Sequence, residues 1–367
     1  MATPSPYDYF TRLAGAILDG RLYLTEGPKW LNELIPIPQG RFYVPFSPMP
    51  TLVSIPFLLL SRVITQSTIA AFTGALTAVT TTTLALKITG SPKKGLYVWL
   101  TVGFGSLYWF LGSVGSSWYF GQLTSGLFLT LALLEANTKK RPIVAGILLG
   151  GSYLARPHTL LAFPVILYLL VLHHAPKPKL RLSKNQFRPI VLFALGISVF
   201  LLTNFAYNFV RFGVIWDKGY VLIPNVLSEP WFQEGIFSLS YIPRHINTMF
   251  ASLPVKIEGF PYFVPSWHGL SVWFTTPVLV YAFLGKLDGL ARVTWLSIVL
   301  AGLPIITHGT TGVAQFGYRY LVDLYPLFFF LIIRYLKSTK LAWHHYFLLL
   351  WSVGVSVWGL LTLPLFA

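Results

Sequence analysis

The feature that most constrains this chain is the way its few charges are sorted between long apolar runs. Only 10% of the 367 residues are charged, whereas 54% are hydrophobic. A helix needs about 20 predominantly apolar residues to cross the hydrocarbon core of a bilayer. The runs are continuous, without the alternation that barrel strands require. The pattern therefore predicts an all-α polytopic membrane protein, located in the cell membrane.

Ten apolar segments are expected to form membrane-spanning helices. Their ranges are 67–88, 95–113, 119–136, 142–155, 158–174, 189–210, 268–286, 293–308, 318–336 and 343–366. The stretch 142–174 would be about 50 Å long as a single helix. Because Pro157 disfavours a helical conformation at Arg156, we expect two short helices that form a hairpin here.

The loops between these segments fall into two groups of different charge. One group, which includes 139–141 and 175–188, carries 16 of the 27 Lys and Arg but two of the 11 acidic residues. Cytoplasmic loops carry such an excess of Lys and Arg, so we predict this group to be cytoplasmic. Residues 1–66 are then outside, with the proline-interrupted stretch 48–64 as a helix in the interface. If 48–64 spanned the membrane, the first 47 residues would be cytoplasmic.

This topology starts the chain on the outer side without a preceding span. We expect either export of a short N-terminal tail without a span or a further helix that this sequence lacks. Residues 1–367 are expected to form a single integral-membrane domain. Its parts are an outer segment with interfacial helices (1–66), a first group of spans (67–210), an outer loop (211–267) and the last four spans (268–367).

Composition also excludes several classes of function. The net charge of +16 lies at the ends of the spans, which indicates membrane topology and argues against a nucleic-acid partner. The absence of cysteine excludes disulfides, thiolate zinc sites and thiol catalysis. The histidines are scattered without ligand spacing, so no metal site is predicted, although a divalent metal held by assembled side chains stays open. Membrane lipids are the expected partners.

Acidic residues near the N-terminus are candidates for general-base catalysis. Apolar residues repeat with helical spacing after Ser5, which predicts an amphipathic helix on the outer membrane surface that ends near Gly20. Asp8 fits three interpretations: a capping box begun by Ser5, an ion pair with Arg12, or a base at the membrane surface. For Asp19, an ion pair in a solvated turn is the simpler interpretation.

Two arginines at the outer ends of the spans are candidates for binding an anion. Arg156 lies at the tip of the expected hairpin, where its guanidinium could bind a phosphate with two hydrogen bonds or extend toward ordinary lipid headgroups. Arg319 and Asp323 are four residues apart at the start of a span, and Tyr320 between them is a further candidate for binding the substrate. Charges at such positions are costly and usually functional, so Asp323 either forms an internal ion pair or orients Arg319 toward an anion.

Three further polar residues are expected near the outer face. Gln122 could hydrogen-bond a polyol or join two helices. Tyr43 could contact a phosphate or a sugar, or anchor the chain at the interface. Arg211 opens the large outer loop and is a candidate for contacting the substrate, although solvated ion pairs with Asp217 and Lys218 are the default interpretation.

Short motifs along nearly the whole chain share a common order and a common outer side. They are Tyr7-Asp8-Tyr9-Phe10 leading to Asp19-Gly20-Arg21-Leu22-Tyr23, Gly40-Arg41-Phe42-Tyr43-Val44-Pro45 before Pro48 and Pro50, Gly121-Gln122, Ala155-Arg156-Pro157, Arg211-Phe212-Gly213 with Gly219-Tyr220, and Phe316-Gly317-Tyr318-Arg319-Tyr320. In this pattern the chain resembles the GT-C class of integral-membrane glycosyltransferases, in particular the protein-mannosyltransferase-like members of glycosyltransferase family 39.

The resemblance implies an inverting glycosyltransferase that takes a sugar from a polyprenyl-phosphate donor on the non-cytoplasmic side. An acidic residue of the first external loop activates the acceptor in that family, and Asp8 matches it best, with Asp19 or Glu26 as a second acid. Arg156 and Arg319 are the candidates for holding the donor phosphate. The family normally has a span before the acidic residue, which supports a missing first helix.

Two other functions are compatible with a polytopic membrane protein. A transporter or lipid flippase would place charges at mid-membrane depth and break helices in paired halves. The charges here lie at the ends of the spans, and no paired halves are apparent, so this alternative ranks second. A non-catalytic scaffold whose outer loops bind a partner ranks third. The sequence does not name the sugar or the acceptor, which could be a protein, a glycan or a lipid.

Overall fold

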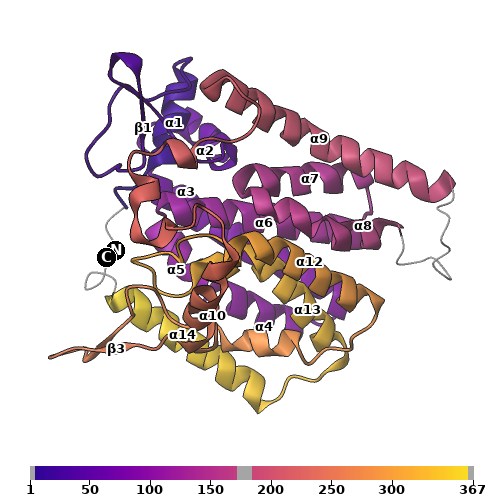
Figure 1. The fold of residues 1–367 in the computed structure, drawn as a ribbon. Helices are drawn as coiled ribbons and strands as arrows, with labels where there is room; N and C mark the ends of the chain where they lie inside the picture. Colours follow the sequence, from indigo (N-terminus) through magenta and orange to yellow (C-terminus); the bar gives the residue numbers. More distant parts are fainter. Residues whose placement is uncertain (1–4, 172–183, 363–367) are drawn as a thin grey trace.

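A computed structural model describes residues 5–171 and 184–362 as a nearly all-α bundle (Figure 1). The α-helices are α1 (Tyr9–Leu18), α2 (Met49–Leu60), α3 (Gln66–Thr89), α4 (Pro92–Gly103), α5 (Leu107–Val114), α6 (Ser117–Asn137), α7 (Pro142–Ala155), α8 (Phe163–Val171), α9 (Lys184–Phe212), α10 (Ile242–Ala251), α11 (Val272–Thr275), α12 (Gly289–Ile306), α13 (Tyr325–Ser338) and α14 (Trp343–Thr362). Most of the predicted basic loop 175–188 lies outside the described residues.

Short 3₁₀ helices and two small antiparallel hairpins connect these helices. The 3₁₀ helices are η1 (Pro38–Gly40), η2 (Pro157–Ala162), η3 (Tyr220–Leu222), η4 (Val226–Ser228), η5 (Pro230–Phe232), η6 (Leu239–Tyr241), η7 (Pro277–Ala282) and η8 (Arg319–Leu324). The hairpins pair β1 (Ile35–Ile37) with β2 (Arg41–Tyr43) and β3 (Val255–Lys256) with β4 (Phe263–Val264).

Four helices of the described chain are long and apolar enough to cross a membrane: α3, the Phe187–Phe212 part of α9, α12 and α14. The bent pair α4–α5, with an angle of 48° between its halves, would make a fifth. Helix α6, over the expected span 119–136, is continuous and 21 residues long but is not among these four. The other expected spans are short or interrupted within the described residues, which therefore do not show ten continuous spans. The segment expected at 318–336, for example, is divided into η8 and α13, because Pro326 occupies the first turn of α13.

The hairpin of two short helices predicted at 142–174 is confirmed over residues 142–171, the part of it that the structure describes. Helix α7 ends at Ala155, Arg156 has an extended backbone, and Pro157 begins η2 before α8 continues the chain. Proline disfavours a helical residue before it, which explains the break. At this break the Arg156 side chain reaches η8, where it forms an ion pair with Asp323.

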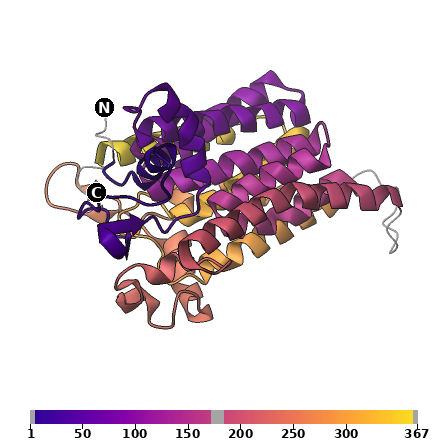
Figure 2. The same cartoon turned by 90° about the horizontal axis from the view of Figure 1, so that it is seen from above.

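Helix α6 lies at the centre of the main core and packs against α3, α7, α8 and α13. Helix α9 lies alongside α7 in both Figure 1 and Figure 2. A Cβ on Gly146 would clash with the Phe193 carbonyl, and one on Gly196 would clash with the Ile143 carbonyl. The glycines therefore let the backbones of α7 and α9 approach closely, as small residues do in membrane bundles.

The N-terminal segment packs onto the bundle with its own small core. The predicted amphipathic helix is present as α1, but it begins at Tyr9, and its apolar face is buried against protein. The capping-box interpretation is wrong, because Asp8 precedes the helix and its side chain makes no capping hydrogen bond. Asp8 accepts a hydrogen bond of 2.6 Å from Arg12. The predicted helix at 48–64 corresponds to α2.

The loops meet in two groups at opposite ends of α3. We call the first group the loop end; it comprises residues 5–65, 115–117, 213–271 and 307–318, and it lies at the left of Figure 1. Hydrogen bonds from Gln66 to the carbonyls of Tyr7 and Gly115 join parts of it. The basic end comprises residues 87–94, 137–142, 283–289 and 334–342, joined by contacts such as the Asp288–Arg334 ion pair.

Arg211 joins the end of α9 to the N-terminal segment. Its guanidinium donates to the Val44 carbonyl at 2.7 Å and to the Asn208 Oδ1 at 3.0 Å, and it lies 3.6 Å from the centre of the Tyr207 ring. Its exposed fraction is 7%. The default interpretation of solvated ion pairs with the following loop is therefore wrong, and the guanidinium predicted to bind substrate is occupied by contacts that hold the fold.

We expect Arg211→Met to lower thermal stability. The variant leaves the Val44 carbonyl buried without its donor, which costs about 1–3 kcal/mol. Thermal unfolding in detergent, followed by circular dichroism, measures the effect. The matched control is Arg188→Met, at an exposed position near the other end of α9. Equal unfolding midpoints for the two variants would contradict a structural role for Arg211.

Candidate functional site

Charged and aromatic side chains from five segments converge at the loop end. The segments are the strip before β1, the start of α6, the break between α7 and η2, the residues after α12, and η8. The polar members of the cluster are Glu33, Gln122, Arg156, His158, His308, Arg319 and Asp323. Because these segments are far apart in the sequence, the site exists only in the folded chain.

Glu33 is positioned by the apolar residues on either side of it. Leu31 and Leu34 are buried in the core of the N-terminal segment, so the chain between them is fixed against α1. The Glu33 N–H donates to the Tyr9 hydroxyl at 3.1 Å. The Glu33 carboxylate accepts a hydrogen bond of 3.0 Å from the indole N–H of Trp118, at the start of α6. One contact therefore fixes its backbone and another aims its side chain at the bundle.

Burial raises the pKa of Glu33 from the usual 4.5 to about 7. The positive charge of Arg319 and the hydrogen bond from Trp118 oppose this effect, and the charge of Glu229 adds to it. Desolvation therefore dominates over the attraction of the nearby guanidinium. Near neutral pH, Glu33 exists in both protonation states, which is the condition for efficient general acid–base chemistry.

Arg319 is a buried guanidinium without a carboxylate partner among the described residues. Its exposed fraction is 9%, and its Nε has no hydrogen-bond acceptor in the described chain. The guanidinium lies 5.8 Å from the Trp118 ring, 5.6 Å from Tyr119 and 5.1 Å from Tyr320. Aromatic faces stabilise a cation only partly. The arrangement leaves capacity to bind an anion.

Asp323 pairs with Arg156 and His158, not with Arg319. The Asp323 Oδ2 lies 3.1 Å from both Nε and Nη2 of Arg156 and 3.2 Å from Nε2 of His158, and the residue is fully buried. The expectation that Asp323 pairs with or orients Arg319 is therefore wrong. Residues 319–324 form a 3₁₀ helix, which changes the α-helical spacing on which that expectation rested.

Aromatic rings from the large loop and the α12–η8 connection form a wall beside these charges. The ring of His308 lies 5.6 Å from Tyr220, 5.5 Å from Phe232 and 6.0 Å from Tyr320, measured between centroids. The Arg156 guanidinium lies 5.9 Å from the centre of the Tyr320 ring. Tyr320, a predicted binding residue, therefore contacts both arginines. Flat aromatic surfaces next to hydrogen-bonding groups suit a polar ring such as a sugar.

A pocket of about 140 Å³ opens beside the cluster. Its lining residues are Phe10, Pro45, Phe46, Ser47, Ser117, Trp118, Gly121, Ala155, Arg156, Pro157, Asp217 and Tyr220. The residues from the N-terminal segment are mostly apolar, whereas Trp118, Arg156 and Tyr220 also belong to the charged and aromatic cluster. The pocket can therefore hold a molecule with an apolar part and a polar part.

The two predicted catalytic acids are both engaged in ion pairs with arginines. Asp8 and Asp19 flank the ten residues of α1, which at 1.5 Å per residue separates them by about 15 Å. Asp19 is bound to Arg21 at 2.9 Å, as its simpler interpretation predicted, and to Arg62 at 3.5 Å. Asp8 is bound to Arg12 at 2.6 Å.

The other predicted binding residues have structural contacts. Gln122 donates to the Arg319 carbonyl at 2.8 Å, so it joins α6 to η8, while its buried Oε1 has no partner in the described chain. Tyr43 in β2 packs edge-on against Phe212, with centroids 6.1 Å apart. The described residues contain no group of three His, Asp or Glu that could hold a metal ion.

Glu33 is the candidate site residue that the sequence interpretation missed. The signal for it was weak: a carboxylate among apolar residues in Leu31-Asn32-Glu33-Leu34-Ile35, where burial of a charge would be costly. Its partner Trp118 follows 85 positions later, which no spacing rule connects.

Comparison with protein-family models, with curated proteins and with solved structures finds no match for this chain. The chemistry of the site is therefore inferred from its own residues.

We expect the stability of the protein to fall as Glu33 ionises. Because its pKa is raised in the folded state, the neutral form stabilises the fold below the usual pKa of 4.5, and this contribution is lost as the pH rises through about 7. Thermal midpoints measured between about pH 5 and about pH 8 should fall more for the wild type than for Glu33→Gln. Glu26→Gln, at an exposed position, is the control. Parallel curves for the wild type and Glu33→Gln would refute the raised pKa.

Proposed function

We propose that this protein is an inverting glycosyltransferase that transfers a sugar from a polyprenyl-phosphate donor at the loop end. The observation that carries the proposal is the buried, unpaired guanidinium of Arg319 close to Glu33, a carboxyl group with a pKa near 7. Such a pair can bind a phosphate leaving group and accept a proton within one cluster.

The charge balance of the cluster favours an anionic ligand. Asp323 compensates Arg156, so the charge of Arg319 remains, and Glu33 compensates it only when ionised. An isolated buried charge is costly, and an anion that binds there recovers part of this cost. A phosphate suits two neighbouring arginines because each guanidinium can donate two parallel hydrogen bonds. Arg156, whose side chain is 26% exposed, is accessible to such a ligand.

Glu33 replaces Asp8 as the proposed base. In the proposed step, the carboxylate of Glu33 removes the proton of an acceptor hydroxyl while the acceptor oxygen forms a bond to the anomeric carbon. The bond between that carbon and the phosphate oxygen breaks, and its electron pair leaves with the polyprenyl phosphate. Arg319 and Arg156 stabilise the charge on the leaving phosphate. A base with a pKa near neutrality is well matched to this task.

The apolar surroundings support a lipid-linked donor. Pro45, Phe46 and Ser47 line the pocket directly before α2, and the far end of this helix exposes Leu59 and Leu60. Exposed apolar side chains along a helix that starts at the pocket suit contact with a long polyprenyl chain. The positive-inside rule assigns the loop end to the non-cytoplasmic side, and the short and broken apolar segments complete a multi-span topology. Irregular backbone at membrane depth is tolerated where protein buries it, as at η8.

We expect Glu33→Gln to reduce sugar transfer by about 10²–10⁴-fold, the usual contribution of a general base. The measurement is transfer of labelled sugar from polyprenyl-phosphate donors to extracted acceptors. For the wild type, kcat should rise with pH through about 7. Asp8→Asn is the matched control and should keep most of the activity, because Asp8 binds Arg12. Loss of activity in Asp8→Asn alone would restore Asp8 to the role of base.

We expect Arg319→Gln to weaken donor binding and slow transfer together. Hydrogen bonds to a charged group contribute about 1.5–3 kcal/mol, so kcat/KM for the donor should fall roughly 10- to 150-fold. Arg12→Gln, which removes an arginine from a partly exposed ion pair at the same end, should change it little. If neither variant nor wild type transfers any sugar from such donors, while the protein moves lipids across vesicles, the transferase proposal is wrong and a flippase is favoured.

A further inference from the structure

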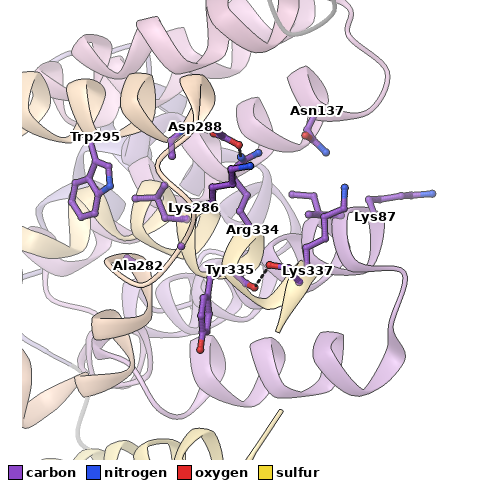
Figure 3. Close-up of a pocket in the computed structure, with 14 residues that line it drawn as sticks. Lys87, Asn137, Ala282, Lys286, Asp288, Trp295, Arg334, Tyr335 and Lys337 are labelled. Atoms are coloured by element: carbon purple, nitrogen blue, oxygen red, sulfur yellow. Dashed lines mark hydrogen bonds and ion pairs between the residues drawn. The ribbon is translucent and has the colours of Figure 1, made fainter. Parts of the chain in front are cut away.

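A pocket of about 430 Å³ lies at the basic end, away from the proposed transferase site (Figure 3). Its walls come from the last turn of α3, the end of α6, the connection between η7 and α12, and the second half of α13. The charged residues of its lining are Lys87, Lys286, Asp288, Arg334 and Lys337. It thus brings together cations from three separate parts of the sequence.

The single acidic residue of this pocket is already engaged. One carboxylate oxygen of Asp288 accepts a hydrogen bond of 2.9 Å from the Ala291 N–H and so caps α12. Its other oxygen binds Arg334 at 2.6 Å, as Figure 3 shows. Lys87, Lys286 and Lys337 have no carboxylate partner within the described residues. Lys94 adds a further cation, since its ammonium group donates to the Lys337 carbonyl at 3.4 Å.

Helix dipoles do not neutralise this charge. Lys87 and Lys337 lie in the last turns of α3 and α13, where each helix end contributes roughly −0.5 of an elementary charge. The N-terminus of α12 contributes roughly +0.5 in the same region. The lining contains four cationic side chains and one anionic one. The C-terminus of α6 also reaches the pocket at Asn137 and contributes roughly −0.5. About two positive charges therefore remain, which is a condition that favours a bound anion.

The rest of the lining is mainly apolar, with Asn137, Tyr335 and Ser338 as its polar members. It includes Ile88, Ala282, Ala291, Trp295 and Leu331. Beside it, the connection that carries Lys286 also exposes Phe283, Leu284 and Leu287, each by more than half of its surface. A loop in which a lysine alternates with exposed large apolar side chains is suited to the interface of a bilayer. A ligand of this pocket would therefore meet cations at one end and hydrocarbon at the other.

We propose that the pocket at the basic end binds the phosphate group of an anionic membrane lipid, with its acyl chains along the apolar residues of α12 and the preceding connection. Basic pockets between helices recognise lipid phosphates by charge and shape. The bound lipid bridges α3, α12 and α13, so it stabilises this end of the bundle. The proposal is independent of sugar transfer, because it concerns residues at the opposite end of α3.

The test uses the full chain, purified in a zwitterionic detergent, with short-chain phosphatidylglycerol, short-chain phosphatidylcholine and inorganic phosphate as three separate probes. Binding is measured by native mass spectrometry and by the shift of the thermal midpoint. We expect phosphatidylglycerol to bind the wild type at least tenfold more tightly than phosphatidylcholine. The double variant Lys286→Gln with Lys337→Gln should lose about tenfold in that affinity, since it removes two unpaired cations.

The control is Lys139→Gln with Lys340→Gln, which removes two exposed lysines of the same end that do not line the pocket. It should bind phosphatidylglycerol as the wild type does. An equal loss in both double variants would show diffuse surface attraction and overturn the proposal. Stabilisation by inorganic phosphate as strong as that by the lipid would also overturn it, in favour of a free phosphate. If the first double variant unfolds in phosphatidylcholine alone, Lys87→Gln takes its place with the same expectations.

Discussion

The ion pair between Arg156 and buried Asp323 is the interaction on which the candidate site depends. It joins the break after α7 to η8, two irregular segments that are 167 positions apart in the sequence. A buried carboxylate without a partner would be strongly destabilising, so the two segments have to meet. Their meeting places Tyr320 against the guanidinium of Arg156 and leaves Arg319, on the same short helix, without a carboxylate partner in the described part of the chain. The capacity for an external anion follows from this pairing.

The N-terminal segment supplies the carboxyl group of Glu33 to the site and also fixes where that group lies. Helix α1 is joined to the start of α6 through Ser117, which donates its backbone N–H to the Tyr7 carbonyl and accepts the Tyr9 N–H at its hydroxyl. Tyr9 in turn holds the backbone of Glu33. The segment therefore acts as a clamp that brings a carboxyl group over the bundle. Asp8 forms an ion pair with Arg12 inside this segment, and we propose that this contact holds the segment together.

Sequence patterns identified the parts of this protein that depend on neighbouring residues. The helical repeat after Ser5 predicted α1, and the Arg156-Pro157 pair predicted the hairpin, because both effects act over a few residues. Arg156, Arg319 and Tyr320 were identified from their place at the ends of apolar runs, and the structure brings them together. The predicted contact between Asp323 and Arg319 was wrong because a 3₁₀ segment replaced the expected α-helix. Glu33 was missed because its environment comes from α1 and α6.

The sequence by itself determined the apolar, helical character of the chain and the division of its charges into two groups of loops. These properties follow from composition and short-range sterics, which are complete in the unfolded chain. Only the tertiary structure decided which charges compensate one another, which arginine stays unpaired at the loop end, and which lysines gather in the basic pocket. Electrostatic pairing and desolvation depend on distance and burial, and side chains acquire both only when remote segments pack together.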